Sequence, residues 1–434
     1  MKKIIYGLAI ISLIVTACEH NIVDINDAIN EDGASIDTTL EDNIVDNNDS
    51  TYLGTVPVDK IDVISYMTNE FGWKLFQQIA KGVTDKNVII SPLSVQVALS
   101  MVANGANGAT VEEILKVLGC KGCELKGLNE QTAALRSLME EQSGNPRLIS
   151  ANAFFYDPQK LDIKESFEQV LVEYYRSEIK AYDFSSPSTL LDINEWVKEN
   201  TNNKIDKILE KINEEDLAFI INALHFKAEW SNGFPPYATF SYVFENAKNQ
   251  DVVVEYLNSD YYFLFARDEY FNLVDVMFKD STYSLSLVQP ISANQYNEDW
   301  ISSIDSKRLT DLWSLLSQDR INLTVPKFEV EFEQELIDPL KQLGISKAFS
   351  PFEANFSNLG NSLVGPRMYI GQARHKAILK IDEYGAEGGA VTAFGIVYDS
   401  APPQLTFDKP FVIVLRHRQT NTILFAGRIN DPSL

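Results

Sequence analysis

One stretch near the C-terminus sets the strongest constraint on this fold. Residues 383–403 read E-Y-G-A-E-G-G-A-V-T-A-F-G-I-V-Y-D-S-A-P-P, and between residues 384 and 406 only Glu387 and Asp399 are charged. Disordered loops are usually polar and charged, whereas this one contains small, β-branched and aromatic residues that could form a strand. A long structureless loop in a compact domain is normally functional or disordered. We therefore interpret this loop as a strand held in reserve.

A period of two divides the loop into two faces if it becomes a strand. The first face starts small and could pack on an existing sheet without clashes; it comprises Ala386, Gly388, Ala390, Thr392, Phe394 and Ile396. The second face keeps Glu387 in water and continues with Gly389, Val391, Ala393 and Gly395. Strand-like runs at 377–382 and 411–416 flank the loop.

The first residues indicate export. Lys2 and Lys3 precede an apolar run, 4–15, that is too short to span a bilayer comfortably, so we predict a signal peptide over residues 1–17. The run ends in V-T-A-C, which resembles a bacterial lipobox and implies cleavage before Cys18 with acyl chains on that residue. Several acyl chains hold a protein on a membrane where one does not. The alternative is an ordinary signal peptide with a coincidental cysteine.

We expect residues 18–59 to form an acidic, flexible tether. Positions 19–58 contain ten Asp or Glu and no Lys or Arg, a composition typical of disordered, self-repelling segments. The whole chain carries a net charge of -24, which argues against a nucleic-acid partner. Residues 60–434 show neither a repeat nor a linker, and we expect them to form one domain.

The remaining cysteines, Cys120 and Cys123, form C-K-G-C. A zinc site would need two more ligands, and the sequence has no second Cys or His cluster. A redox motif would need a strand-helix context that is not evident here. A local disulfide or two free thiols therefore remain.

Hydrophobic periodicity predicts helices mainly in the first half and strands in the second. Helical spacing covers 61–82, 92–102, 167–175, 190–199 and 333–343, and a further helix begins at Thr110, with Glu113 in the spacing of a capping box. Strand-like runs are 87–90, 148–155, 219–230, 252–257, 272–278, 283–288, 322–330, 377–382, 411–416 and 423–429. This order predicts an α+β fold, not alternating βαβ units.

No familiar catalytic motif occurs: G-x-S-x-G, a P-loop and H-E-x-x-H are all missing from the sequence. The four histidines are His20, His225, His375 and His417, and nothing positions a nucleophile near them. Isolated histidines beside strands are more often structural than catalytic. We expect neither an enzyme nor a bound cofactor or metal, with a hydrolase that uses one of these histidines as a rival.

Ordered motifs from about residue 60 to the end resemble the serpin family. They are N-V-I-I-S-P-L-S-V-Q-V-A-L (87–99), I-I-N-A-L-H-F-K-A-E-W (220–230), L-T-V-P-K-F (323–328), Q-L-G-I-S-K-A-F (342–349), H-K-A-I-L-K-I-D-E-Y-G-A-E (375–387) and F-D-K-P-F-V-I-V-L-R-H-R-Q-T-N-T-I-L-F-A-G-R-I-N-D-P (407–432). The resemblance implies the serpin fold, with large mixed β-sheets, surrounding helices and an exposed reactive-centre loop.

The resemblance further implies a suicide inhibitor of endopeptidases. A serine protease, or a cysteine protease, would attack the loop and form an acyl-enzyme. The cut loop would then insert as a new strand in the main sheet and distort the protease before deacylation. A metastable native fold would supply the energy, and we expect a monomer. The alternative is a non-inhibitory serpin that acts as a surface binding protein.

Carried over from the family, the hinge comprises Gly385, Ala386, Glu387, Gly388, Gly389, Ala390, Val391 and Thr392. Gly388 and Gly389 replace the usual alanines, and Ala386 replaces the usual Thr or Ser. Glycine lowers strand propensity and adds entropy to the free loop. Insertion is therefore expected to be somewhat slower, although no proline or inward charge blocks it.

Counting from Gly385 and anchoring on the prolines at 402–403 places the cleaved bond between Asp399 and Ser400. Asp399 would suit a basic specificity pocket, as in granzyme-like or caspase-like proteases. A shift of one or two residues would offer Tyr398 to a chymotrypsin-like pocket or Val397 to an elastase- or subtilisin-like one. Ser400 is on the leaving side of the bond and is not a nucleophile.

Five further residues match positions that control sheet opening in this family. Ser91, Ser94, Asn222 and His375 match the polar cluster where the strands part, and Trp230 matches the tryptophan where insertion begins. Buried polar groups must stay hydrogen-bonded, so they can decide which state of the sheet is preferred. Plain core structure is the alternative. We thus expect an exported inhibitor, lipid-anchored on the periplasmic face or the cell surface.

Overall fold

The computed structural model describes residues 58–140, 147–296, 300–386 and 402–434, and the chain from Thr55 to Leu434 forms one compact unit. The signal peptide and most of the tether lie outside the described residues, so both stay predictions. Within the described ranges, no helix combines the length and the hydropathy that crossing a membrane requires.

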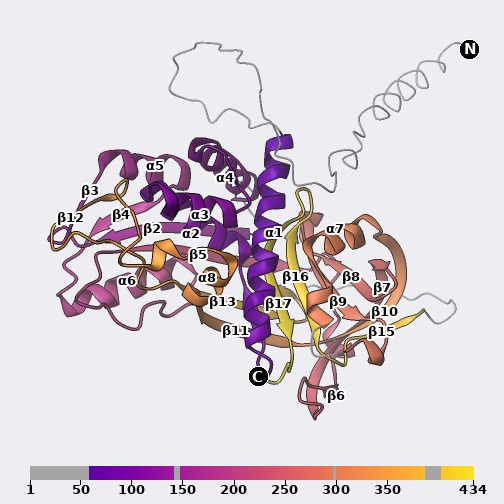
Figure 1. The fold of residues 1–434 in the computed structure, drawn as a ribbon. Coiled ribbons are helices and arrows are strands. Elements are labelled where there is room, and N and C mark those ends of the chain that lie inside the picture. The colour runs from indigo at the N-terminus through magenta and orange to yellow at the C-terminus, as the bar shows by residue number, and fades with distance from the viewer. Residues whose placement is uncertain (1–57, 141–146, 297–299, 387–401) are drawn as a thin grey trace, which may run out of the picture. The chain divides into compact units, whose positions relative to one another are not determined.

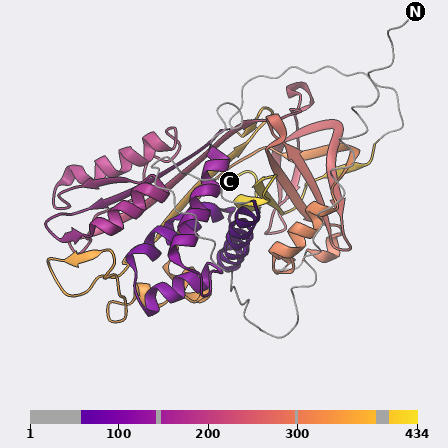
Figure 2. The same cartoon turned by 90° about the horizontal axis from the view of Figure 1, so that it is seen from above.

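The helices of the described part surround two main groups of strands (Figure 1). They are α1 (Val58–Gly82), α2 (Pro92–Gly105), α3 (Ala109–Val117), α4 (Leu125–Glu140), α5 (Glu165–Tyr175), α6 (Pro187–Asn200), α7 (Ser306–Ser314) and α8 (Ile337–Leu343). Short 3-10 helices lie at η3 (Pro236–Ala238), η4 (Lys279–Ser281), η5 (Ala293–Gln295), η6 (Trp300–Ser303) and η7 (Lys347–Phe349). Seen from above, the N-terminal helices and the strands coloured salmon lie on opposite sides of α1 (Figure 2).

The largest sheet runs in the order β1-β17-β16-β9-β8-β7-β10-β15, and β6 also pairs with β7. Its strands are β1 (Val88–Ile90), β6 (Phe240–Glu245), β7 (Asp251–Arg267), β8 (Phe271–Met277), β9 (Tyr283–Pro290), β10 (Ser317–Pro326), β15 (Gln404–Thr406), β16 (Phe411–His417) and β17 (Thr422–Ile429). Strands β16 and β17 are buried at every position, and apolar residues make up most of both strands.

A second sheet has the order β14-β5-β2-β4, and β11 pairs with β13 in a separate ladder. These strands are β2 (Arg147–Tyr156), β4 (Glu178–Ala181), β5 (Ala218–Glu229), β14 (Gly385–Ala386), β11 (Phe328–Glu335) and β13 (Arg374–Ile381). A small ladder joins β3 (Leu161–Ile163) to β12 (Gly360–Ser362). The observed α+β architecture with large mixed sheets agrees with the prediction.

Two sequence predictions around residue 327 are wrong. The expected single strand 322–330 is divided at Lys327, because the chain up to Pro326 pairs with β7 whereas the chain from Phe328 pairs with β13. The expected helix 333–343 begins only at Ile337, because residues 328–335 form β11. Buried and exposed residues alternate along most of β11, which is the pattern of a strand with one face on the core.

The expected capping box at the start of α3 is also wrong. The N-cap is Gly108, and the Thr110 hydroxyl accepts a hydrogen bond from the Asn355 amide at 3.0 Å. The Glu113 carboxylate accepts from the Ser346 and Lys347 amides, each at 2.8 Å. Both side chains therefore serve tertiary contacts, which outweigh the local cap that their spacing suggested.

A buried ion pair ties β8 to β16 inside the largest sheet. Arg416 and Asp275 lie 2.7 Å apart, with side chains 4% and 0% exposed. The Ser286 hydroxyl donates to Asp275 at 2.6 Å, and the Arg416 guanidinium lies 4.6 Å from the centre of the Trp313 ring. Removing one partner of such a pair leaves an uncompensated buried charge.

We expect Arg416→Ala to lower the free energy of unfolding by about 3–5 kcal/mol, because buried Asp275 would keep only the more distant Arg418, at 3.9 Å, as an ion-pair partner. Lys307→Ala is the matched control, since Lys307 forms an exposed pair with Asp311 at 2.9 Å, and such pairs contribute only about 0–1 kcal/mol. Denaturant unfolding measures both. Equal losses in the two variants would contradict the assignment.

Candidate functional site

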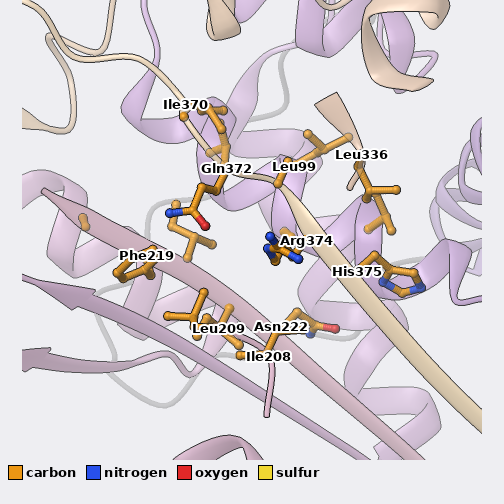
Figure 3. A pocket seen from close by; sticks show the side chains of 18 of the residues that line it. Leu99, Ile208, Leu209, Phe219, Asn222, Leu336, Ile370, Gln372, Arg374 and His375 are labelled. Atoms are coloured by element: carbon orange, nitrogen blue, oxygen red, sulfur yellow. The ribbon is translucent and has the colours of Figure 1, made fainter. Parts of the chain in front are cut away.

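A gap runs between β5 and β13. In the described part of the chain no ladder joins these strands. A cavity of about 270 Å³ lies between them, lined by β5 residues 218–224 and by 374–376 at the start of β13 (Figure 3). A second space of about 20 Å³ continues along 224–226 and 378–380 to Ala386. The gap therefore extends from the start of β5 to the hinge.

Trp230 closes the hinge end of the gap. Its backbone amide donates to the Tyr384 carbonyl at 2.9 Å, and its indole Nε1 donates to the Asp382 carbonyl at 3.0 Å. The ring stacks on Phe278 with centroids 4.4 Å apart. These bonds fix the chain that leaves β13 against the end of β5.

Beyond this point the hinge already lies in the sheet. Gly385 is opposite Glu229 and Ala386 is opposite Ala228 in an antiparallel ladder. Gly385 adopts φ +146°, and a Cβ there would lie 2.0 Å from the Ala228 carbonyl oxygen. Only glycine fits such a close approach with this backbone. The structure thus gives a steric reason for the residue at 385.

A carboxylate that sequence analysis missed anchors the turn before the hinge. Glu383 is 9% exposed, and it accepts hydrogen bonds from the Thr239 hydroxyl at 2.9 Å and from Lys327 Nζ at 3.2 Å. Burial works to raise the pKa of Glu383, but these hydrogen bonds and the Lys327 charge outweigh it and lower the pKa. Glu383 and Lys327 both lie in motifs quoted above. Their pairing could not be predicted, because it joins segments that are distant in the sequence.

The predicted polar cluster surrounds the larger cavity: Ser91, Ser94, Asn222 and His375 all line it, whereas Trp230 lies at the hinge end. The Ser91 amide donates to His375 Nε2 at 3.0 Å, and the Ser94 amide donates to the Ser91 hydroxyl at 3.3 Å, which caps α2. Burial lowers the pKa of His375 to about 4, so its ring is neutral near pH 7. Because Nε2 accepts, the proton sits on Nδ1.

Asn222 supplies an unused acceptor to the same cavity. Its amide nitrogen donates to Asn152 Oδ1 at 2.8 Å, while its Oδ1 has no partner among the described residues. Figure 3 shows Asn222 on β5 and His375 on β13, the two strands that border the cavity. Unpaired buried acceptors are rare in folded proteins and call for an explanation.

Helix α6 and the segment after it cover the other side of β5. Ile193 and Trp196 of α6 pack with Phe219 in a separate apolar cluster. The side chain of Asn194 fastens the following segment: its Oδ1 accepts from the Ile208 and Leu209 amides at 2.9 and 3.0 Å, and its Nδ2 donates to the Leu209 carbonyl at 2.9 Å. Any strand that enters the gap must pass beneath this cover.

The other candidate residues lie apart from the gap or outside the description. His417 is buried, and its Nδ1 lies 2.9 Å from the Thr420 hydroxyl. Cys120 and Cys123 form a disulfide. Among the described residues no group of His, Cys, Asp and Glu could hold a metal ion. Cys18, the hinge from Glu387 to Thr392 and the candidate cleavage residues Val397, Tyr398, Asp399 and Ser400 lie outside the described residues and stay predictions.

Comparison with known proteins identifies the family. The family model "Serpin (serine protease inhibitor)" matches residues 66–432. The chain belongs to the serpin family. Plasminogen activator inhibitor 1 of Sus scrofa is 27% identical over 377 residues, which cover 84% of this chain and 92% of that protein.

Solved serpin structures share the fold. Tengpin, a thermophilic serpin, in its native state is 28% identical with a TM-score of 0.78, covering 89% of this chain and 96% of tengpin. Human thyroxine-binding globulin in complex with thyroxine is 25% identical with a TM-score of 0.77, covering 86% of this chain and 99% of that one. Of these similar proteins, plasminogen activator inhibitor 1 is named as an inhibitor, whereas thyroxine-binding globulin binds the small molecule thyroxine.

We expect Gly385→Ala to displace the hinge from β5, because the new Cβ would overlap the Ala228 carbonyl. Gly122→Ala is a matched control, since Gly122 also has positive φ but has open space around it. Hydrogen exchange of the β5 amides near Ala228 should rise in the first variant only. Unchanged exchange at these amides in Gly385→Ala would contradict the steric argument.

Acid should destabilise the fold through His375. Its folded pKa of about 4 lies below its ordinary 6.5, so the unfolded chain binds the proton more readily and stability falls as pH drops from 6.5 to 4. The full effect of this residue is about 3 kcal/mol. In His375→Gln the loss of unfolding free energy over this window, measured by denaturant titration, should be correspondingly smaller. Identical slopes in the two proteins would refute this assignment.

Proposed function

We propose that this serpin inhibits endopeptidases by inserting its cleaved loop as a strand between β5 and β13. The observation that carries the proposal is the ladder of Gly385 and Ala386 on β5, beside a gap that continues along the rest of that strand. The facing edges of β5 and β13 offer backbone groups to a new strand, and each hydrogen bond contributes about 0.5–1.5 kcal/mol net.

Continuing the observed register gives the loop a definite placement in the inserted state. In an antiparallel pair, each step of two residues along the loop moves two residues back along β5. Ala390 would therefore lie opposite Leu224. In the same way Thr392 would lie opposite Asn222, and Phe394 opposite Ile220. Leu224 and Ile220 pack against the main core, whereas Ile221 and Ala223 pack with the α6 cluster. The small alternate residues of the loop would thus face the main core, where space is limited.

The chemistry of trapping follows from this placement. The protease nucleophile attacks the carbonyl carbon of the cleaved bond, proposed as Asp399-Ser400, and the new amine of Ser400 leaves with a proton. The acyl bond to the protease remains on Asp399 or, with a shifted register, on Tyr398 or Val397. Insertion then carries the acyl-enzyme along β5 before water can hydrolyse it. In this role the chain is an inhibitor and catalyses no reaction of its own.

The likeness to thyroxine-binding globulin supports a second candidate, a serpin that binds a ligand without trapping a protease. The cavity between β5 and β13 favours it. Hinge residues without proline or inward charge favour inhibition.

We also propose that the inhibitor is exported and acts as a monomer at the bacterial envelope. The support is the sequence alone: the V-T-A-C motif for a lipid anchor at Cys18, and the acidic composition of 18–59 for a tether.

A panel of serine and cysteine proteases tests the proposal. A target should form a covalent complex that survives denaturing electrophoresis, and mass spectrometry of the released loop fragment should identify the bond. The cleaved protein should melt at a much higher temperature than the native one. Cleavage inside the loop by every protease tested, with no covalent complex and no rise in melting temperature, would disprove the inhibitory mechanism.

Loop variants test the register. Ala390→Glu would place a charge opposite Leu224 in the core, and burying an unpaired charge is costly, so we expect cleavage without trapping. Glu387→Gln is the control, because its partner Lys227 is exposed, and it should trap normally. Equal trapping by both variants would show that the register is wrong.

A further inference from the structure

The disulfide between α3 and α4 joins two cysteines in unequal surroundings. Cys120 is bonded to Cys123. Cys120 is 6% exposed and belongs to the main core, whereas Cys123 is exposed. The pair lies between two helices and far from the gap between β5 and β13 in the sequence. A reagent in solution therefore meets Cys123 first.

The turn that carries this disulfide leaves room for such a reagent. The Cys123 amide donates to the Cys120 carbonyl at 3.4 Å and closes a turn of the type that needs a positive φ at its third residue. Gly122 occupies that position with φ +80°, and no other part of the protein lies within 4 Å of a Cβ built on it. The turn is thus open on the side of Gly122, next to the exposed cysteine.

The disulfide contributes little as a staple. It joins residues only 3 positions apart, and the stabilisation from a disulfide grows with the length of the loop that it closes. Other contacts hold the two helices. The Cys120 amide donates to the Leu115 carbonyl at 2.7 Å at the end of α3, and Asn104 and Asn129 exchange two hydrogen bonds of 2.9 Å between α2 and α4. Opening the disulfide should therefore leave α3 and most of α4 in place.

The helix ends favour Cys123 as the reactive residue once the bond is open. The thiolate is the nucleophilic form of a cysteine, and negative charge is stabilised at the N-terminal end of a helix and destabilised at the C-terminal end. Cys123 lies just before α4, whereas Cys120 lies just after α3. The charged neighbours Lys121, Glu124 and Lys126 add more positive than negative charge around Cys123.

We propose that Cys120 and Cys123 form a reversible exchange site for external thiols, with Cys123 as the residue that is attacked and Cys120 as the residue that resolves the mixed disulfide. Residues 60–434 contain no other cysteine, so the pair can exchange only with a thiol from outside the domain. The site does not depend on protease inhibition.

The exchange takes two steps. An external thiolate attacks the Cys123 sulfur and forms a mixed disulfide, and Cys120 leaves and takes a proton from water. A second external thiolate attacks the external sulfur of the mixed disulfide, and Cys123 leaves as a thiolate. Overall two external thiols are oxidised to one disulfide, and the protein disulfide is reduced to two thiols. In the reverse direction Cys120 displaces the external thiolate from Cys123 and restores the bond.

The folded wild-type protein gives the first test. The full chain is equilibrated with mixtures of glutathione and glutathione disulfide, quenched with acid, alkylated and analysed by mass spectrometry. The fraction of dithiol should follow the mixture and return when the mixture is reversed, while circular dichroism shows a folded chain. Reduced thioredoxin in place of glutathione distinguishes a protein dithiol from a small thiol as the better reductant. A disulfide that either reductant opens only as fast as the chain unfolds would overturn the inference.

Single variants test the two roles. In Cys120→Ser nothing resolves the mixed disulfide, so glutathione should accumulate on Cys123. In Cys123→Ser the remaining Cys120 should react with glutathione disulfide at least about tenfold more slowly, because buried cysteines are inert. In denaturant the two variants should react at similar rates, which is the matched control for the effect of the fold. Equal rates in the folded variants, or glutathione found on Cys120 of the wild-type protein, would contradict the assigned roles.

Discussion

The unpaired edges of β5 and β13 are the constraint on which the rest of this structure depends. Backbone N–H and C=O groups need partners, and a strand edge without one is open to addition of another strand. In the described part of the chain these two edges face each other with no ladder between them. Only the first residues of the hinge occupy the space, at Gly385 and Ala386. The fold thus contains a place for one more strand in its own sheet.

Three groups of side chains hold this arrangement in place from different directions. Trp230 and the Glu383–Lys327–Thr239 contacts fix the turn from which the hinge departs. Ser91 and His375 join α2 to β13 beneath the gap. The cover on the opposite side is formed by α6 and the segment fastened by Asn194. None of these contacts fills the gap itself, so the strands on both sides are held in place while the space between them stays open.

Sequence periodicity predicted most of the elements that build the site, including α2, β5 and β13, because each has a clear local pattern. It failed at 322–343, where the chain pairs with β7 up to Pro326 and with β13 from Phe328 onward. The gap and the hinge register could not be predicted, because they depend on pairing between segments more than 150 residues apart. The roles of Ser91, Asn222 and His375 came from family resemblance, and the structure adds that they share one cavity. Asp399 and Ser400 remain sequence predictions.

The clasp formed by Asn194 has a consequence for timing. Under the proposed mechanism the strand enters at Ala386, beside Ile205, and passes Ile208 and Leu209 last, in the segment that three hydrogen bonds of Asn194 hold over the gap. Under that mechanism a protease stays trapped only if hydrolysis of the acyl bond is slower than passage of the strand beneath this segment, so proteases that deacylate slowly would be trapped and fast ones released.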